Sequence, residues 1–357
     1  MCYLPASGVD GIIWLVNVLY LYPIKADDLT DLRRQLRPGI VLTAPSAFLD
    51  AGDALVGLEE LPTDFDGIQD WIPVADVFVA DWADPGMLAR ATRLRAIIVP
   101  YAGVPARLRA PLQRFPAIAV YNCHFNAVLV AEHAWALALA VAKRIVECDQ
   151  ALRRGDWTPR YKGLRSTLLR GKTAGIVGYG SIGRAVAGIA QGFGMRVLAI
   201  RRRPAEGDPG FVGDMTHLDE LLAQSDVVFV CLPLTAETRG LIGEEAFQEI
   251  KPSAIVVNVG RGPVVDEAAF YHALREGRIR GAGIDTWHVY PRAPEERSCT
   301  APSRYPFGEL PNVVLSPHRA AAVEEVEQLR MICVADALNR LARGESPPGV
   351  VDLAQGY

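Results

Sequence analysis

Short apolar runs alternate with amphipathic stretches along nearly the whole chain. The first series of apolar, β-branched runs covers roughly residues 16–22, 40–43, 77–79, 96–100 and 117–121. A second series covers 173–177, 196–200, 227–231, 254–259, 281–284 and 312–315. Apolar runs of this length are typical of strands that are buried on both faces of a sheet. The pattern therefore predicts an α/β fold with parallel sheets.

Longer stretches between these runs predict helices. Residues 128–148 are rich in Ala, Leu and Val and are too long for one strand, so we expect a helix there. Residues 153–171 are basic and irregular and contain Pro159, which indicates a connection. Further helices are expected at 182–193, 244–250, 266–276 and 320–343, the last ending at Gly344 ahead of Pro347 and Pro348.

Size and charge narrow the class of protein. A chain of 357 residues exceeds the usual limit of one hydrophobic core, so two domains are expected. The net charge of −4 argues against nucleic acid as the main partner, because phosphate binding needs a broad basic surface. The six cysteines form no C-x-x-C pair, so neither a metal site nor a disulfide framework is expected.

The apolar stretch at residues 11–24 raises the question of a signal sequence or a membrane anchor. It is too short to span a bilayer, and no Lys or Arg precedes it. We therefore expect an untargeted, cytoplasmic protein with reduced thiols and no membrane partner.

A glycine motif, Gly178-Tyr179-Gly180-Ser181-Ile182-Gly183, follows the apolar run at 173–177 and opens a predicted helix. The first glycine permits a tight turn, the second lets the backbone approach a pyrophosphate, and the third lets helix and strand pack closely. The N-terminus of the helix then presents free N–H groups to the phosphates. This context predicts a dinucleotide site.

The residue that reads the adenosine ribose is expected at the end of the next strand. For NAD it is an acidic side chain, but here the predicted strand ends in Arg201-Arg202-Arg203, and no carboxylate stands at that point of the sequence. Guanidinium groups pair strongly with a 2′-phosphate. The cluster therefore predicts NADP(H) as the cofactor, with NAD(H) as the alternative.

From Trp157 onward the chain resembles the D-isomer-specific 2-hydroxyacid dehydrogenases, in particular glyoxylate and hydroxypyruvate reductases. The matching stretches are residues 169–173, 231–240, 258–266, 281–285 and 316–319, with weaker matches at 101–104 and 126–133. The resemblance implies two Rossmann-like domains, with a dinucleotide-binding domain at 128–318 inserted into a substrate-binding domain at 1–127 and 319–357. It also implies a homodimer made largely through the cofactor domains.

The resemblance assigns roles to individual residues. Arg261 matches the arginine that grips the carboxylate and carbonyl of a small 2-keto acid, and a planar, permanently charged fork suits that task. His318 matches the acid/base that protonates the carbonyl oxygen, and Asp285 matches the acceptor of the nicotinamide carboxamide. Further cofactor contacts are implied for Leu232, Pro233, Thr238, Val259, Gly260 and His318. Substrate contacts are implied for Tyr101, Ala102, Gly103, Val104 and Asn126.

One position departs from the family pattern. Members usually carry a glutamate that bonds the catalytic imidazole, but Tyr290 stands there, before Pro291. A phenol accepts a hydrogen bond but carries no charge at pH 7. Three explanations stay open: Tyr290 orients His318, Glu295 or Glu296 replaces the missing carboxylate, or the reaction needs no proton transfer.

The expected function is NADPH-dependent reduction of a small 2-keto acid to a D-2-hydroxy acid. The third explanation leaves a formate-like or other unusual substrate as an alternative, because formate dehydrogenases of this fold also lack the glutamate. A second alternative is a cofactor-sensing corepressor-like protein, since such relatives keep the catalytic residues.

Overall fold

The computed structural model describes residues 15–49, 68–162, 165–205, 207–209 and 211–353. The chain forms two compact units, one from residues 1–126 and 323–357 and the other from residues 127–322. The sequence-based prediction places the boundaries after residues 127 and 318. None of the described helices combines the length and the apolar character that a bilayer crossing requires.

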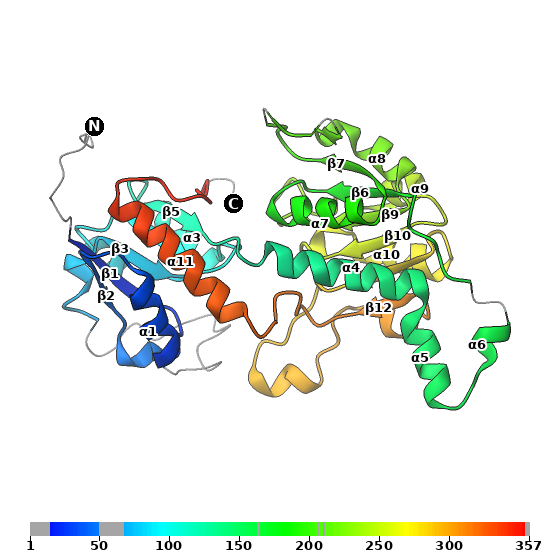
Figure 1. Ribbon diagram of the computed structural model, residues 1–357, viewed down its shortest axis with the longest axis horizontal. Helices are drawn as coiled ribbons and strands as arrows, with labels where there is room; N and C mark the ends of the chain where they lie inside the picture. The colour runs from blue at the N-terminus through cyan, green and yellow to red at the C-terminus, as the bar shows by residue number, and fades with distance from the viewer. Residues whose placement is uncertain (1–14, 50–67, 163–164, 206, 210, 354–357) are drawn as a thin grey trace. The chain divides into compact units, whose positions relative to one another are not determined.

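The first unit holds a five-stranded parallel sheet in the order β2-β1-β3-β4-β5 (Figure 1). Its strands are β1 (Val16–Leu21), β2 (Ile40–Thr43), β3 (Val77–Ala80), β4 (Ala96–Val99) and β5 (Ala119–Asn122). Helices α1 (Ala26–Gln35) and α11 (Val326–Ala342) pack against one face. The short helices α2 (Pro85–Arg90) and α3 (Ala106–Leu112) pack against the other. Each face therefore has its own apolar core.

The second unit holds a seven-stranded parallel sheet in the order β12-β11-β10-β9-β6-β7-β8. Its strands are β6 (Thr173–Val177), β7 (Arg196–Ile200), β8 (Val212–Gly213), β9 (Val227–Val230), β10 (Ile255–Asn258), β11 (Gly281–Ile284) and β12 (Val313–Leu315). Helices α4 (Ala127–Lys143) and α7 (Ser181–Gly192) cover one face. Helices α8 (Leu218–Gln224), α9 (Glu244–Glu249) and α10 (Glu267–Arg275) cover the other.

The predicted fold class is confirmed: both sheets are parallel and both carry helices on the two faces. In the second unit the order of the strands reverses between β6 and β9, as in doubly wound dinucleotide-binding folds. Ligands of such sheets bind beyond the carboxyl ends of the strands at this reversal. The glycine motif follows β6 at that point.

Two helix predictions are wrong. The helix expected at 128–148 ends at Lys143, because Arg144 adopts a left-handed conformation with φ 54°, and a separate helix α5 (Ile145–Arg153) follows. The connection that follows contains a short helix α6 (Thr158–Tyr161). The last helix begins at Val326 and not near residue 320, because Ala320 and its neighbours form a turn that is bonded to Asp285.

Candidate active site

The glycine turn has the shape that a pyrophosphate cradle needs. Gly178 has φ +109°, a conformation that residues with a side chain rarely adopt. A Cβ on Gly183 would meet the carbonyl oxygen of Gly178 at 2.2 Å, so helix α7 can approach β6 only with glycine there. A Cβ on Gly180 would have no neighbour within 4 Å, so that side of the turn is open. The open side lies at the N-terminus of α7, and the residues present therefore fit a dinucleotide.

The surroundings of the arginines after β7 differ in one respect from what the sequence predicts. A carboxylate does reach the arginine cluster: Asp208 lies 3.0 Å from Nη1 of Arg201 and 2.9 Å from Nη2 of Arg184. The sequence shows no acidic residue at the end of the strand because Asp208 comes seven positions later and folds back through the following loop. Arg202 and Arg203 are exposed beside it.

The turn after β9 is held by the hydroxyl group of Thr238. The hydroxyl of Thr238 donates to the carbonyl oxygen of Pro233 at 2.7 Å and accepts the N–H of Thr235 at 2.8 Å. Thr238 therefore closes the turn that presents Leu232 and Pro233 beside the glycine motif. A Cβ on Gly260 would lie 2.5 Å from the carbonyl oxygen of Leu232, so only glycine lets the two segments lie this close.

Arg261 follows β10 and is exposed at the carboxyl edge of the sheet. The buried side chain of Asn258 holds this segment by donating to the carbonyl oxygen of Arg261 at 3.3 Å and accepting the N–H of Gly260 at 3.1 Å. The guanidinium donates from Nη1 to the carbonyl oxygen of Gly260 at 2.8 Å. Among the described residues it forms no ion pair, so its charge is available to a ligand.

His318 lies in a turn after β12 that is fixed by a buried carboxylate. Asp285, at the end of β11, accepts the hydroxyl proton of Ser316 at 2.5 Å and the backbone N–H groups of Arg319 and Ala320 at 2.9 and 3.2 Å. Within this turn His318 has φ 52°, in the left-handed region. Asp285 therefore fixes the backbone on which the imidazole is mounted.

Tyr290 contacts the imidazole directly. Its hydroxyl oxygen lies 3.0 Å from Nδ1 of His318 and accepts the N–H of Trp287, also at 3.0 Å. The two rings lie 5.5 Å apart between centroids. Because the phenol takes Nδ1, Nε2 is the nitrogen left for a substrate.

The charges around His318 favour its neutral form. Desolvation by the surrounding protein and the positive charge of Arg261 lower the pKa of His318, and Asp285 opposes them. Desolvation likewise raises the pKa of Tyr290, so the phenol stays protonated at neutral pH. The site therefore holds a weak base beside a neutral partner, where the family pattern has a carboxylate.

The alternative partners for His318 do not reach it among the described residues. Glu296 accepts the N–H of Arg292 at 2.8 Å within its own loop, and Glu295 forms no bond to the imidazole. His288 is bonded to the carbonyl oxygen of Val265 at 3.0 Å and lies 3.8 Å from Glu267. Of the three explanations, the one in which Tyr290 orients His318 agrees with the observed contacts.

The substrate residues expected from the first domain are found within the first unit. The hydroxyl of Tyr101 donates to Asp81 at 2.7 Å, and Arg107 forms an ion pair with the same carboxylate. The carbonyl oxygen of Ala102 accepts from Asn122, and Val104 is buried beside Gly103. The amide oxygen of Asn126 is buried and has no hydrogen-bond partner among the described residues, so it can accept a hydrogen bond from a ligand.

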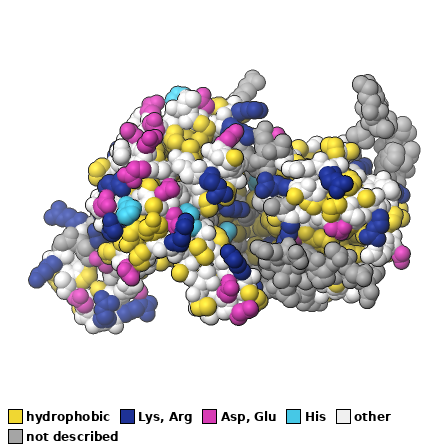
Figure 2. Space-filling model, turned by 180° about the vertical axis from the view of Figure 1, so that it is seen from behind, with side chains coloured by type: hydrophobic (Ala, Val, Ile, Leu, Met, Phe, Trp, Pro, Cys, Tyr) yellow, Lys and Arg dark blue, Asp and Glu magenta, His cyan; other side chains and the backbone are white. Residues whose placement is uncertain are grey.

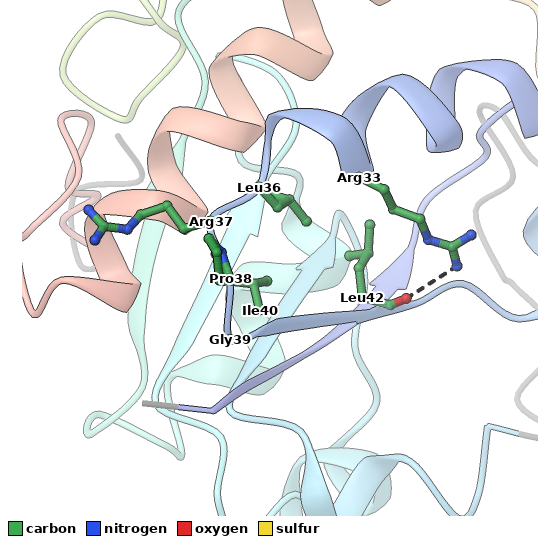
Figure 3. A pocket seen from close by; sticks show the side chains of 7 residues that line it. All are labelled: Arg33, Leu36, Arg37, Pro38, Gly39, Ile40 and Leu42. Atoms are coloured by element: carbon green, nitrogen blue, oxygen red, sulfur yellow. Dashed lines mark hydrogen bonds between the residues drawn. The ribbon is translucent and has the colours of Figure 1, made fainter. Parts of the chain in front are cut away.

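A pocket of about 310 Å³ in the first unit lies between the end of α1 and β2 (Figure 3). Its charged side chains are Arg33 and Arg37, which extend away from each other in the close-up. Arg33 donates to the carbonyl oxygen of Leu42 at 3.3 Å. Because the described residues that line this pocket include no acid, base or nucleophile, it is a weaker candidate for a catalytic site than the residues around His318.

Sequence reasoning missed the groups that hold the site in place. His133 on α4 was assigned no role, yet its Nε2 lies 2.8 Å from the hydroxyl of Ser316 and 3.5 Å from Asp285. Asn258 and Asp208 were missed as well. His133 and Ser316 are 183 positions apart, so no local pattern could have joined them. Asp208 and Asn258 lie close in sequence to Arg201 and Arg261, but only the folded turns show which atoms they contact. Among the described residues no group of His, Cys, Asp and Glu suits a metal ion, and the five described cysteines form no disulfide.

Comparison with known proteins points to one family. Residues 135–320 match the description "D-isomer specific 2-hydroxyacid dehydrogenase, NAD binding domain". A glyoxylate reductase of Aeropyrum pernix is 36% identical over 285 residues, which cover 77% of this chain and 81% of that protein. A glyoxylate reductase of Korarchaeum cryptofilum is 42% identical over 227 residues, which cover 62% of this chain and 65% of that protein.

Solved structures show the same architecture. A D-isomer-specific 2-hydroxyacid dehydrogenase from Xanthobacter autotrophicus Py2, solved with NADPH and MES, superimposes with a TM-score of 0.71 at 26% identity. The match covers 96% of this chain and 99% of that protein. An acyclic imino acid reductase solved with NADPH and D-Arg gives a TM-score of 0.71 at 23% identity, a likeness of fold.

Proposed function

The chain belongs to the D-isomer-specific 2-hydroxyacid dehydrogenase family, and on that premise we propose that it reduces a small 2-keto acid to a D-2-hydroxy acid. The observation that supports this proposal is that Arg261 and the hydrogen-bonded residues Tyr290 and His318 lie at the same edge of one sheet. All three follow strands of the sheet that bears the glycine turn, and all lie at its carboxyl edge.

The proposed chemistry divides the work among these groups. Arg261 binds the carboxylate and carbonyl oxygens of the substrate and polarises the carbonyl carbon. A dinucleotide held at the glycine turn would supply the hydride. His318 in its protonated form gives the proton from Nε2 to the carbonyl oxygen, so that one hydride and one proton convert the keto acid to the hydroxy acid.

We propose NADPH as the preferred cofactor. Arg201, Arg202 and Arg203 follow β7, next to the glycine turn, where the adenosine ribose of a dinucleotide binds in this fold. Gly178 and Tyr179 both donate their N–H groups to the carbonyl oxygen of Ile200, which joins the turn to the end of β7. A 2′-phosphate at that place would be met by several guanidinium groups.

The proposal is tested by the absorbance of the reduced nicotinamide. We expect purified protein to oxidise NADPH faster than NADH when glyoxylate, hydroxypyruvate or a larger 2-keto acid is supplied. Formate with NADP, measured in the oxidative direction, serves as the comparison. Turnover of formate without turnover of any keto acid would reject the keto acid assignment in favour of the formate-like alternative. Cofactor binding with no turnover at all would favour the corepressor-like one.

We also propose that the protein is a homodimer built on the second unit. Its arm, residues 145–161 of α5 and α6, exposes large apolar side chains, with Trp157 and Tyr161 exposed to 59% and 75%. A groove of about 470 Å³ lies between α4, α5 and residues 308–315 at the edge strand β12. Figure 2 shows cationic side chains at the projecting end of the arm, at lower left.

A second copy of the chain would cover this apolar surface and the groove. Light scattering is expected to give the mass of two chains. Replacement of both Trp157 and Tyr161 by serine is expected to shift that mass toward one chain, while the same change at the exposed Trp71 of the first unit leaves it unchanged. A single-chain mass for the unaltered protein would contradict the proposal.

A further inference from the structure

The carboxylate of Asp208 is enclosed by cations at the end of β7. Arg201 donates to both of its oxygens, at 3.2 and 3.0 Å, and Arg184 donates to one of them at 2.9 Å. The backbone N–H of Ala205 donates to the other at 2.7 Å. The side chain of Asp208 is 6% exposed, whereas those of Arg184 and Arg201 are 49% and 30% exposed.

Asp208 is held there by the fold of its loop. Phe211 packs edge-on against the ring of Tyr179 with centroids 5.7 Å apart, and its carbonyl oxygen accepts the N–H of Ala199 at 2.9 Å. The guanidinium of Arg184 lies 4.8 Å above the same tyrosine ring. The loop is thus anchored on the glycine turn itself, and the carboxylate is part of the ribose end of the cradle.

The carboxylate is ionised at neutral pH. The N–H of Ala205 and the two guanidinium groups hold the pKa of Asp208 below its usual range. A 2′-phosphate that used Arg201 and Arg184 would bring a second anion to two guanidinium groups that already share the negative charge of Asp208. Two anions that share the same donors repel each other, so the phosphate competes with the carboxylate for them. A cofactor with a free 2′-hydroxyl meets no such competition.

We propose that Asp208 is a specificity-determining residue that competes with the 2′-phosphate of NADPH for Arg201 and Arg184 and so narrows the preference for NADPH over NADH. This inference rests on the proposed dinucleotide site and deepens it. The competing explanation is that the ion pairs only fold the loop, in which case loss of the charge would weaken both cofactors alike.

The test compares two small ligands, adenosine 2′,5′-bisphosphate and 5′-AMP, by titration calorimetry with the purified full chain. Asp208→Asn removes the charge but keeps an oxygen that can accept the N–H of Ala205. Asp214→Asn is the matched control, because Asp214 caps Thr216 and His217 nearby and pairs with no arginine among the described residues. Thermal unfolding of each variant checks that the fold is retained.

We expect Asp208→Asn to bind the 2′,5′-bisphosphate about 3- to 10-fold more tightly, the range expected when two partly exposed arginines lose an ionic competitor. Its affinity for 5′-AMP should change by less than about twofold, as should both affinities of Asp214→Asn. Unchanged or weaker binding of the 2′,5′-bisphosphate by Asp208→Asn would overturn the inference, as would equal changes for both ligands.

A separate variant tests the underlying cofactor proposal. Replacement of Arg201 and Arg202 together by alanine should weaken the binding of the 2′,5′-bisphosphate and leave the affinity for 5′-AMP unchanged. If neither that variant nor the unaltered protein binds the 2′,5′-bisphosphate more tightly than 5′-AMP, the proposed preference for NADPH is rejected. In that case a gain of discrimination in Asp208→Asn would still support competition by Asp208, because the carboxylate would then be masking the arginines completely.

Discussion

Replacement of Arg261 by alanine is expected to lower kcat/KM for a 2-keto acid by about a hundred- to a thousandfold, the usual cost of losing a charged donor aimed at the reacting oxygen. The guanidinium is exposed, and its bond within the protein goes to the neighbouring carbonyl oxygen of Gly260. Its removal therefore leaves no buried charge behind, and the fold should survive. Steady-state kinetics with NADPH and the best keto acid measure the effect.

The controls for this variant separate charge from geometry. Arg261→Lys keeps the charge but loses the two-pronged fork, so we expect an intermediate loss. Arg275→Ala removes an exposed arginine from α10 in the same unit and should leave turnover unchanged. Cofactor affinity, followed by fluorescence of the nicotinamide, should stay within about twofold in Arg261→Ala. Turnover within about tenfold of the unaltered enzyme would contradict the role of Arg261 as the substrate clamp.

Replacement of His318 by asparagine is expected to lower kcat by about a hundred- to ten-thousandfold, the range attributed to general acid–base catalysis. Asparagine is the suitable substitute because it tolerates the left-handed conformation that His318 adopts at φ 52°. The turn bonded to Asp285 should therefore keep its shape, and the loss reports the imidazole alone. Retention of turnover with a keto acid would show that the reaction needs no proton from this group.

The pH dependence of the same reaction tests the Tyr290 contact. Reduction needs the protonated imidazole, so activity is present below the pKa of His318 and is lost as the pH rises through it. Because desolvation and Arg261 lower this pKa, the loss should occur at lower pH than for an ordinary histidine. Tyr290→Glu places a carboxylate against Nδ1 and should move the loss to higher pH.

Tyr290→Phe is the control that removes the hydroxyl and adds no charge. It should lower kcat by about tenfold through loss of orientation, and it should not move the pH profile upward. A profile that is identical in the unaltered enzyme, Tyr290→Phe and Tyr290→Glu would mean that the phenol and the imidazole do not interact during turnover.

Most strands could be predicted from the sequence because buried parallel strands consist of continuous apolar residues. The runs at 40–43, 173–177, 196–200 and 281–284 coincide with β2, β6, β7 and β11. The break between α4 and α5 at Arg144 could not be predicted, because nothing in the local sequence indicates that this arginine adopts a left-handed conformation. The delayed start of α11 depends on bonds from residues 319 and 320 to Asp285, which only the folded chain brings together.

The candidate site divides in the same way. The turn at Gly178 and the close packing at Gly183 could be predicted because each is required by local geometry. The roles of Arg261 and His318, which come from motifs of the family, and that of Tyr290, which departs from the family pattern, stay predictions. His133 could not be predicted, because its partner Ser316 is 183 positions away along the chain. Asp208 could not, because only the fold of the loop after β7 brings it back to Arg201. The sequence thus indicates the proposed reacting groups more readily than the groups that position them.

The left-handed backbone at His318 implies that the stability of the fold and catalytic turnover favour different residues at this position. A non-glycine residue in this region costs about 1 kcal/mol or more of folding free energy, and the bonds from Asp285 offset that cost locally. Selection for thermal robustness alone would favour glycine or asparagine at position 318. Under the proposed role of His318 as the proton donor, this turn is less stable than the same turn with glycine or asparagine because the reaction requires an imidazole there.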